Sequence, residues 1–104
     1  MNWKIPNETP IFGHNLKTEW DADLVNDQGA FGMIRYAQNT MVLQEPCKEA
    51  SESLVRQTYF HEYWHCALRH MGYDELADDE TFVDRLAQLD LQKTDHLFKV
   101  NSCE

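Results

Sequence analysis

The chain has 104 residues, and its 18 acidic and 9 basic side chains give a formal net charge of −9. This length allows one domain with a small core and excludes a multidomain protein or a transporter. The acidic balance argues against partners that attract basic surfaces, namely nucleic acids and anionic membranes. No stretch is long and apolar enough to span a membrane, and the N-terminus lacks the apolar segment of a signal peptide. We therefore expect a single cytoplasmic domain over residues 1–104.

Apolar runs in the first half of the chain predict strands. The first run, over residues 11–20, follows Pro10 and ends at a polar stretch. Two further runs, over residues 30–36 and 40–44, flank the polar link 37–39 and predict a β-hairpin. Together they predict a small antiparallel sheet.

Helical patterns dominate the second half. The segment from Ser51 to Met71 predicts a helix, with Ser51 as its N-cap. Gly72 suits a left-handed C-terminal cap, and we expect Tyr73 to pack back onto the helix. The apolar arc expected on this helix comprises Leu54, Phe60, Trp64, Ala67, Leu68 and Met71.

A second helix is expected to begin near Asp78 or Asp79 and to run at least to Gln92. Its expected buried arc comprises Phe82, Val83, Leu86, Ala87 and Leu91. The fold class is therefore α+β, with a small N-terminal sheet followed by two helices.

The first helix contains the sequence His61-Glu62-Tyr63-Trp64-His65, which is an HExxH motif. Residues four apart lie about 40° apart around a helix, so His61 and His65 can bind one zinc ion. Glu62 lies about 100° from His61, where it can act on water rather than bind the metal. The alternative is a pair of structural histidines that hydrogen-bond to polar partners.

A catalytic zinc site needs a third protein ligand. His70 is excluded because it lies about 180° from His61 around the same helix. Asp84 lies at the edge of the buried arc of the second helix and is the predicted third ligand. Glu80, one helical turn before Asp84 on the same side of the helix, is the reserve candidate for the third ligand. The alternative interpretation of Asp84 is an exposed residue of an acidic helix that binds no metal.

The remaining candidates carry weaker signals. His96 could polarise a substrate carbonyl, but a surface residue is the favoured interpretation. His14 is interpreted in the same way. Asp90 falls within the apolar arc of its helix without an explanation from the sequence. Cys66 is expected to be a small buried hydrophobe, and the odd, widely spaced cysteines indicate reduced thiols.

Residues 61–65 and 82–88 together resemble the two signatures of ImmA/IrrE-type zincin-like metallopeptidases, especially the short forms encoded by bacteriophages. Asp84 takes the position of the family's Glu, Gln88 takes that of its Asn, and Trp64 is larger than the residue common there. Further similar stretches are 11–14, 29–34 and 70–76. The resemblance implies a zinc-bearing helix, an acidic ligand on the next helix, and peptide hydrolysis, sometimes of a transcriptional repressor.

The sequence thus predicts a zinc metallopeptidase with His61, His65 and Asp84 as ligands and Glu62 as general base. Its substrate is expected to be a peptide or protein, added as a strand to a sheet edge, with no nucleic-acid or membrane partner. The alternative is an acidic phage-type protein that blocks a basic partner, with a structural or inactive zinc site. Glu62 argues against this alternative because a structural site needs no general base.

Overall fold

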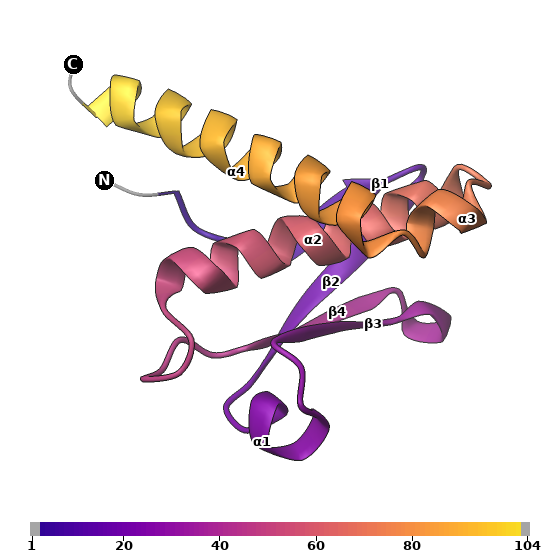
Figure 1. Ribbon diagram of the computed structural model, residues 1–104, viewed down its shortest axis with the longest axis horizontal. Coiled ribbons are helices and arrows are strands. Elements are labelled where there is room, and N and C mark those ends of the chain that lie inside the picture. The colour runs from indigo at the N-terminus through magenta and orange to yellow at the C-terminus, as the bar shows by residue number, and fades with distance from the viewer. Residues whose placement is uncertain (1–2, 103–104) are drawn as a thin grey trace.

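A computed structural model describes residues 3–102 of the chain and the side chains of residues 3–98 (Figure 1). Four strands form one sheet, α2 lies on one face of this sheet, and α4 lies over α2. The elements are β1 (Glu8–Ile11), β2 (His14–Asp21), α1 (Leu24–Gln28), β3 (Gly32–Arg35), the 3₁₀ turn η1 (Tyr36–Gln38), β4 (Thr40–Gln44), α2 (Glu52–His70), α3 (Asp74–Ala77) and α4 (Glu80–Ser102). The α+β class is confirmed.

The sheet is mixed, so the expectation of a purely antiparallel sheet is wrong. Its strand order is β1-β2-β4-β3, and β2 and β4 are parallel while both outer pairs are antiparallel. The segment between β2 and β4 includes α1 and β3 and is long enough for a parallel crossover. Strand β4 therefore lies in the interior of the sheet, and all five of its residues are buried.

Gln44 is a buried polar residue that attaches α1 to β4. Its Oε1 accepts a hydrogen bond of 2.8 Å from the Val25 amide, and its Nε2 donates one of 2.7 Å to the Ala22 carbonyl. Because buried polar groups are costly when unpaired, these two bonds allow a glutamine to end a buried strand.

The predicted single strand over residues 11–20 is two strands joined by a tight turn. Phe12 and Gly13 both have positive φ angles, of 45° and 80°, as in the two-residue turns that suit a β-hairpin. Pro10, taken as a boundary in the sequence, lies inside β1. This position is tolerated because β1 is an edge strand.

The hairpin predicted over residues 30–44 is confirmed. Strand β3 pairs with β4 in antiparallel register, from Gly32 opposite Leu43 to Arg35 opposite Thr40. The link between the two strands contains η1, and Asn39 adopts the left-handed conformation at its end.

Both ends of α2 follow the sequence signals. Ser51 Oγ accepts a hydrogen bond of 3.2 Å from the Leu54 amide, and Gly72 adopts a left-handed φ of 86°. The Tyr73 amide donates to the Leu68 carbonyl, which completes a Schellman cap. The expected packing of the Tyr73 side chain is wrong, because that side chain is 56% exposed.

The predicted start of α4 is also confirmed, since Asp79 Oδ1 accepts a hydrogen bond of 3.1 Å from the Phe82 amide. The short helix α3, which the sequence analysis did not predict, fills the connection between the two long helices (Figure 1).

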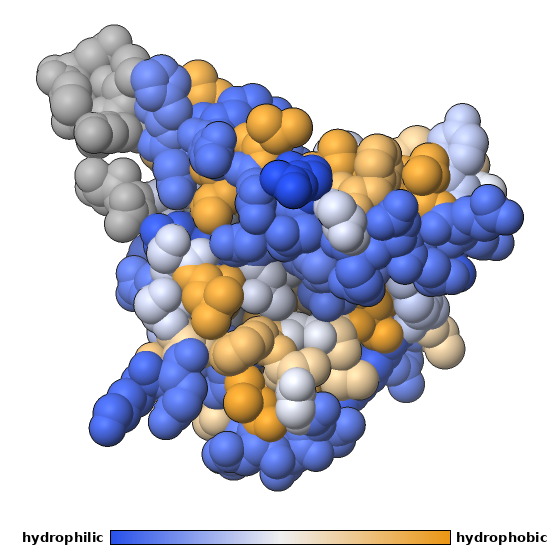
Figure 2. Space-filling model, viewed as in Figure 1, coloured by the Kyte–Doolittle hydropathy of each residue, from blue (hydrophilic) through white to orange (hydrophobic). Residues whose placement is uncertain are grey.

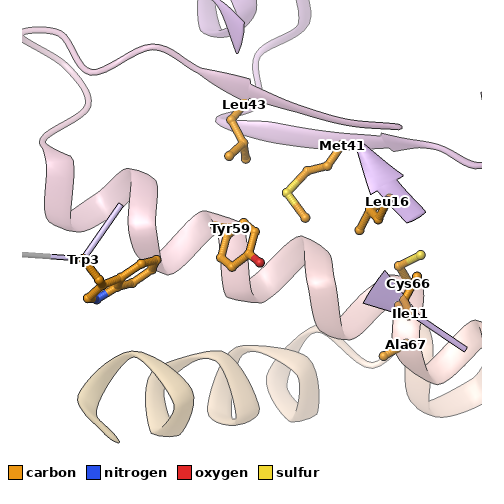
Figure 3. Close-up of a cluster of buried hydrophobic side chains, with 8 residues drawn as sticks. All are labelled: Trp3, Ile11, Leu16, Met41, Leu43, Tyr59, Cys66 and Ala67. Atoms are coloured by element: carbon orange, nitrogen blue, oxygen red, sulfur yellow. The ribbon is translucent and has the colours of Figure 1, made fainter. Parts of the chain in front are cut away.

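The core has two parts because α2 is covered on two sides. The first lies between α2, the sheet and the N-terminal segment, and Figure 3 shows its buried members, Trp3, Ile11, Leu16, Met41, Leu43, Tyr59, Cys66 and Ala67. The second, between α2, α3 and α4, comprises Leu68, Ala77 and Val83, with Trp64 and Leu86 packed against it. Two residues of the expected arcs, Met71 and Phe82, are exposed instead.

No helix in the described part of the chain, residues 3–102, is both long and apolar enough to cross a bilayer.

We predict that Ser51→Ala lowers the free energy of unfolding by about 1 kcal/mol, because the first turn of α2 loses its side-chain acceptor. Ser53→Ala is the control, since Ser53 is exposed on the same turn. Urea unfolding measures both variants, and equal losses would contradict a capping role for Ser51.

Candidate metal centre

The two histidines of the HExxH motif converge as their spacing predicts. Their Nε2 atoms lie 3.1 Å apart, and the ring centroids are separated by 4.7 Å. Both rings are partly buried on α2 beneath the start of α4. The pair therefore presents two nitrogen ligands to one point.

Glu80, the first residue of α4, supplies a carboxylate at that point. Its Oε2 lies 2.9 Å from His61 Nε2, and its Oε1 lies 3.2 Å from His65 Nε2. These three side chains are a group within the described residues that could hold a metal ion. The reserve candidate, rather than Asp84, is thus the acid that reaches both histidines.

The donor set fits a tetrahedral zinc ion. Zinc takes nitrogen and oxygen ligands at about 2.0–2.2 Å, so ligand atoms around it lie about 3.4 Å apart. The two histidine nitrogens lie 3.1 Å apart, and the two oxygens of Glu80 lie 2.9 and 3.2 Å from one histidine nitrogen each, so these separations approach this value. With one oxygen taken from Glu80, all three ligand atoms lie within 4.8 Å of one another. A zinc ion held by these three side chains would keep one position for water or substrate, as in catalytic rather than structural zinc sites.

The second nitrogen of His65 is held by the backbone of α3. His65 Nδ1 lies 2.5 Å from the Ala77 carbonyl oxygen, which can only accept a hydrogen bond. The proton of the neutral ring is therefore on Nδ1, and the lone pair on Nε2 is available to a metal. The sequence cannot reveal this partner because it is a main-chain atom.

Asp84 lies beside the His61 ring nitrogen that Glu80 does not face. Its Oδ1 is 3.6 Å from His61 Nδ1, whereas Glu80 faces Nε2 of the same ring. Gln88 donates a hydrogen bond of 2.9 Å to Oδ2 of Asp84, and Gln57 donates one of 3.4 Å to Oδ1. Gln57 precedes His61 by four residues, so helical spacing alone could have associated it with the site.

Glu62 lies against the start of β3. A Cβ atom added at Gly32 would lie 3.1 Å from Glu62 Cγ and 2.6 Å from Thr58 Cγ2, so only glycine leaves room here. Burial raises the pKa of the Glu62 carboxyl; His65 and His61 partly offset the rise, and Glu80 adds to it. The candidate base therefore lies on the side of α2 that faces an edge strand.

An open cavity of about 480 Å³ adjoins the cluster. It is lined by His61, Glu80, Thr81, Asp84, Arg85 and Gln88. A cavity of about 540 Å³ lies at the N-terminal end of α2, around Trp3, Trp20 and Arg56. Only the smaller one borders the ligand cluster.

The remaining histidines lie away from this site. His70 is exposed, its ring lies 5.2 Å from that of His14, and among the described residues it does not belong to the group of His61, His65 and Glu80. His96 is exposed on α4, 16 residues beyond Glu80 and so about 24 Å along the helix. It therefore cannot polarise a carbonyl at the cluster.

Asp90 and Cys66 have structural roles. Asp90 Oδ2 accepts a hydrogen bond of 2.6 Å from the Trp64 indole, and Lys93 Nζ lies 3.0 Å from its other oxygen. This contact also explains the large residue within the HExxH motif, because Trp64 reaches across to α4. Cys66 is buried as expected, and burial raises the pKa of its thiol.

No protein-family model, curated protein or solved structure matches this chain.

We predict that Gly32→Ala lowers the free energy of unfolding by about 1–3 kcal/mol, because the new methyl group overlaps Thr58 and presses on Glu62. Thr58→Ser removes the methyl group in closest contact while keeping the hydroxyl, so the double variant should recover part of the loss. Urea unfolding of the two single variants and the double variant measures this coupling. Strictly additive losses would contradict the steric explanation.

Proposed function

We propose that this protein is a zinc-dependent peptidase in which His61, His65 and Glu80 hold the metal and Glu62 is the general base. The observation that carries the proposal is the convergence of the three ligand atoms, two of them from an HExxH motif. Two of the three ligand atoms come from histidines on one helix face, which distinguishes this group from a cluster of exposed acids alone. The ImmA/IrrE-type resemblance supports the same reaction class.

Zinc, when bound, supplies a Lewis acid that activates water at neutral pH and polarises a carbonyl. The chain supplies the proton transfer. Glu62 accepts a proton from the attacking water and later donates it to the leaving amine. His65 keeps its orientation through the Ala77 carbonyl, so its ligand nitrogen stays aimed at the metal position.

The substrate we propose is an extended segment of a peptide or protein. Strand β3 has a neighbour on one side only within the described sheet, and Gly32 at its start contacts the Glu62 side of α2. An added strand could pair with the free main-chain groups of β3 and pass close to the base. The family resemblance makes a transcriptional repressor a candidate substrate.

One observation favours the alternative, an acidic protein that blocks a basic partner. The net charge of −9 would attract such a partner whether or not the site is active. The alternative gives no role to Glu62, so a comparison of wild type with a Glu62 variant separates the two functions.

We predict that the wild type binds about one zinc per chain and that Glu80→Ala or His65→Ala weakens binding at least about 100-fold, since each removes one of three ligands. His70→Ala is the control, because His70 lies outside the cluster. Metal analysis and chelator competition measure the affinities. Loss of zinc from His70→Ala, with retention in Glu80→Ala, would refute the ligand set.

We further predict that Glu62→Gln keeps the fold and the zinc but lowers hydrolysis by about 10²–10⁴-fold, because an amide cannot accept the proton from water. The assay compares the zinc content, the melting temperature and the cleavage of an unfolded peptide library or a candidate repressor. Undiminished cleavage would refute the mechanism. Tight binding of a basic partner without cleavage by either form would favour the blocking function.

A further inference from the structure

Two carboxylates face two different nitrogens of one imidazole. Glu80 Oε2 lies 2.9 Å from His61 Nε2, and Asp84 Oδ1 lies 3.6 Å from His61 Nδ1. The two ring nitrogens point away from the ring in different directions, so groups that face them are not interchangeable. A metal held by Nε2 beside Glu80 leaves Nδ1 as a donor that needs an acceptor.

The cluster already shows this arrangement at its other histidine. His65 Nε2 faces Glu80, while His65 Nδ1 donates to the Ala77 carbonyl. Asp84 Oδ1 faces the corresponding nitrogen of His61 at 3.6 Å, which is longer than a hydrogen bond. Each of the two rings thus has Nε2 at the metal position and an acceptor beside Nδ1.

Asp84 is also held in place from two helices. Gln88, four residues later on α4, donates to Oδ2, and Gln57 on α2 donates to Oδ1. Both amides contact the carboxylate through Nε2, a group that can only donate. The two amides therefore contact one carboxylate oxygen each, and Oδ1 lies on the Nδ1 side of His61.

We infer that Asp84 is a positioning residue rather than a metal ligand: with a metal on Nε2 of His61, the Asp84 carboxylate closes from 3.6 Å onto Nδ1 and accepts its proton, while Gln57 and Gln88 hold the carboxylate. In this role it fixes the tautomer and the orientation of the ring so that Nε2 points at the metal position. This inference rests on the proposed zinc site and assigns the two acids of α4 to different tasks, Glu80 to the metal and Asp84 to the histidine.

The substitution of Asp84 by Asn separates these two tasks. An Asn side chain keeps a carbonyl oxygen that can accept a hydrogen bond, but it is a poor substitute for a carboxylate that binds zinc. We expect Asp84→Ala to weaken zinc binding by about 10–100-fold at unchanged stoichiometry. Asp84→Asn should recover most of this affinity, which a metal ligand would not allow.

Spectroscopy of the loaded protein supplies a readout that does not depend on activity. With Co²⁺ as the probe, the visible absorption of Asp84→Ala should keep the form of the wild-type spectrum, whereas Glu80→Ala should change it because a ligand is lost. In the zinc-loaded wild type, nuclear magnetic resonance should detect a proton on His61 Nδ1 that shifts in Asp84→Ala. Glu75→Ala is the control, since it removes an exposed negative charge from α3.

The outcomes distinguish this inference from the proposed function. If Asp84→Asn loses as much zinc affinity as Asp84→Ala and also changes the Co²⁺ spectrum, Asp84 is a ligand. This result would overturn the inference and leave the proposed function standing. Unchanged affinity and an unchanged His61 signal in Asp84→Ala would overturn it as well. A wild type that binds no zinc would refute the proposed function, and the positioning role with it.

Discussion

The packing of α4 across α2 is the contact on which the candidate site depends. Val83 is buried against Leu68, and the Trp64 indole donates to Asp90, so the two helices are held together by apolar burial and by a directional bond. This packing sets which residue of α4 lies above the histidine pair. A slip of one helical turn, about 5.4 Å, would bring a different acid to that point.

The sheet determines what lies on the other side of α2. Because β4 inserts between β2 and β3, the strand nearest to Glu62 is an edge strand with free main-chain groups. A purely antiparallel sheet formed in chain order would have left β4 at an edge instead. The parallel crossover therefore contributes to the proposed chemistry, since it places a potential docking edge beside the candidate base.

Local signals in the sequence predicted local structure well. The Ser51 cap, the Gly72 cap and the convergence of His61 and His65 all depend on residues within a few positions of one another. The sequence pattern predicts Asp84 as the third ligand, whereas the structure brings Glu80 to both histidines. Helical periodicity places both acids on one row, but the axial register between two helices depends on long-range packing that periodicity does not contain. The parallel β2–β4 pairing was missed for the same reason, because alternation along a strand does not identify its partner.

The division of the proposed ligands between two helices would also link a bound metal to the fold. His61 and His65 belong to α2, whereas Glu80 is the first residue of α4 and its side chain is 70% exposed. Without an ion, the contacts of so exposed a carboxylate with His61 and His65 add little to the stability of the fold, because water screens the charges. A bound zinc would join the start of α4 to the middle of α2, so part of its binding free energy would stabilise the packing that creates the site. In a domain with so small a core, the site and the fold would then support each other.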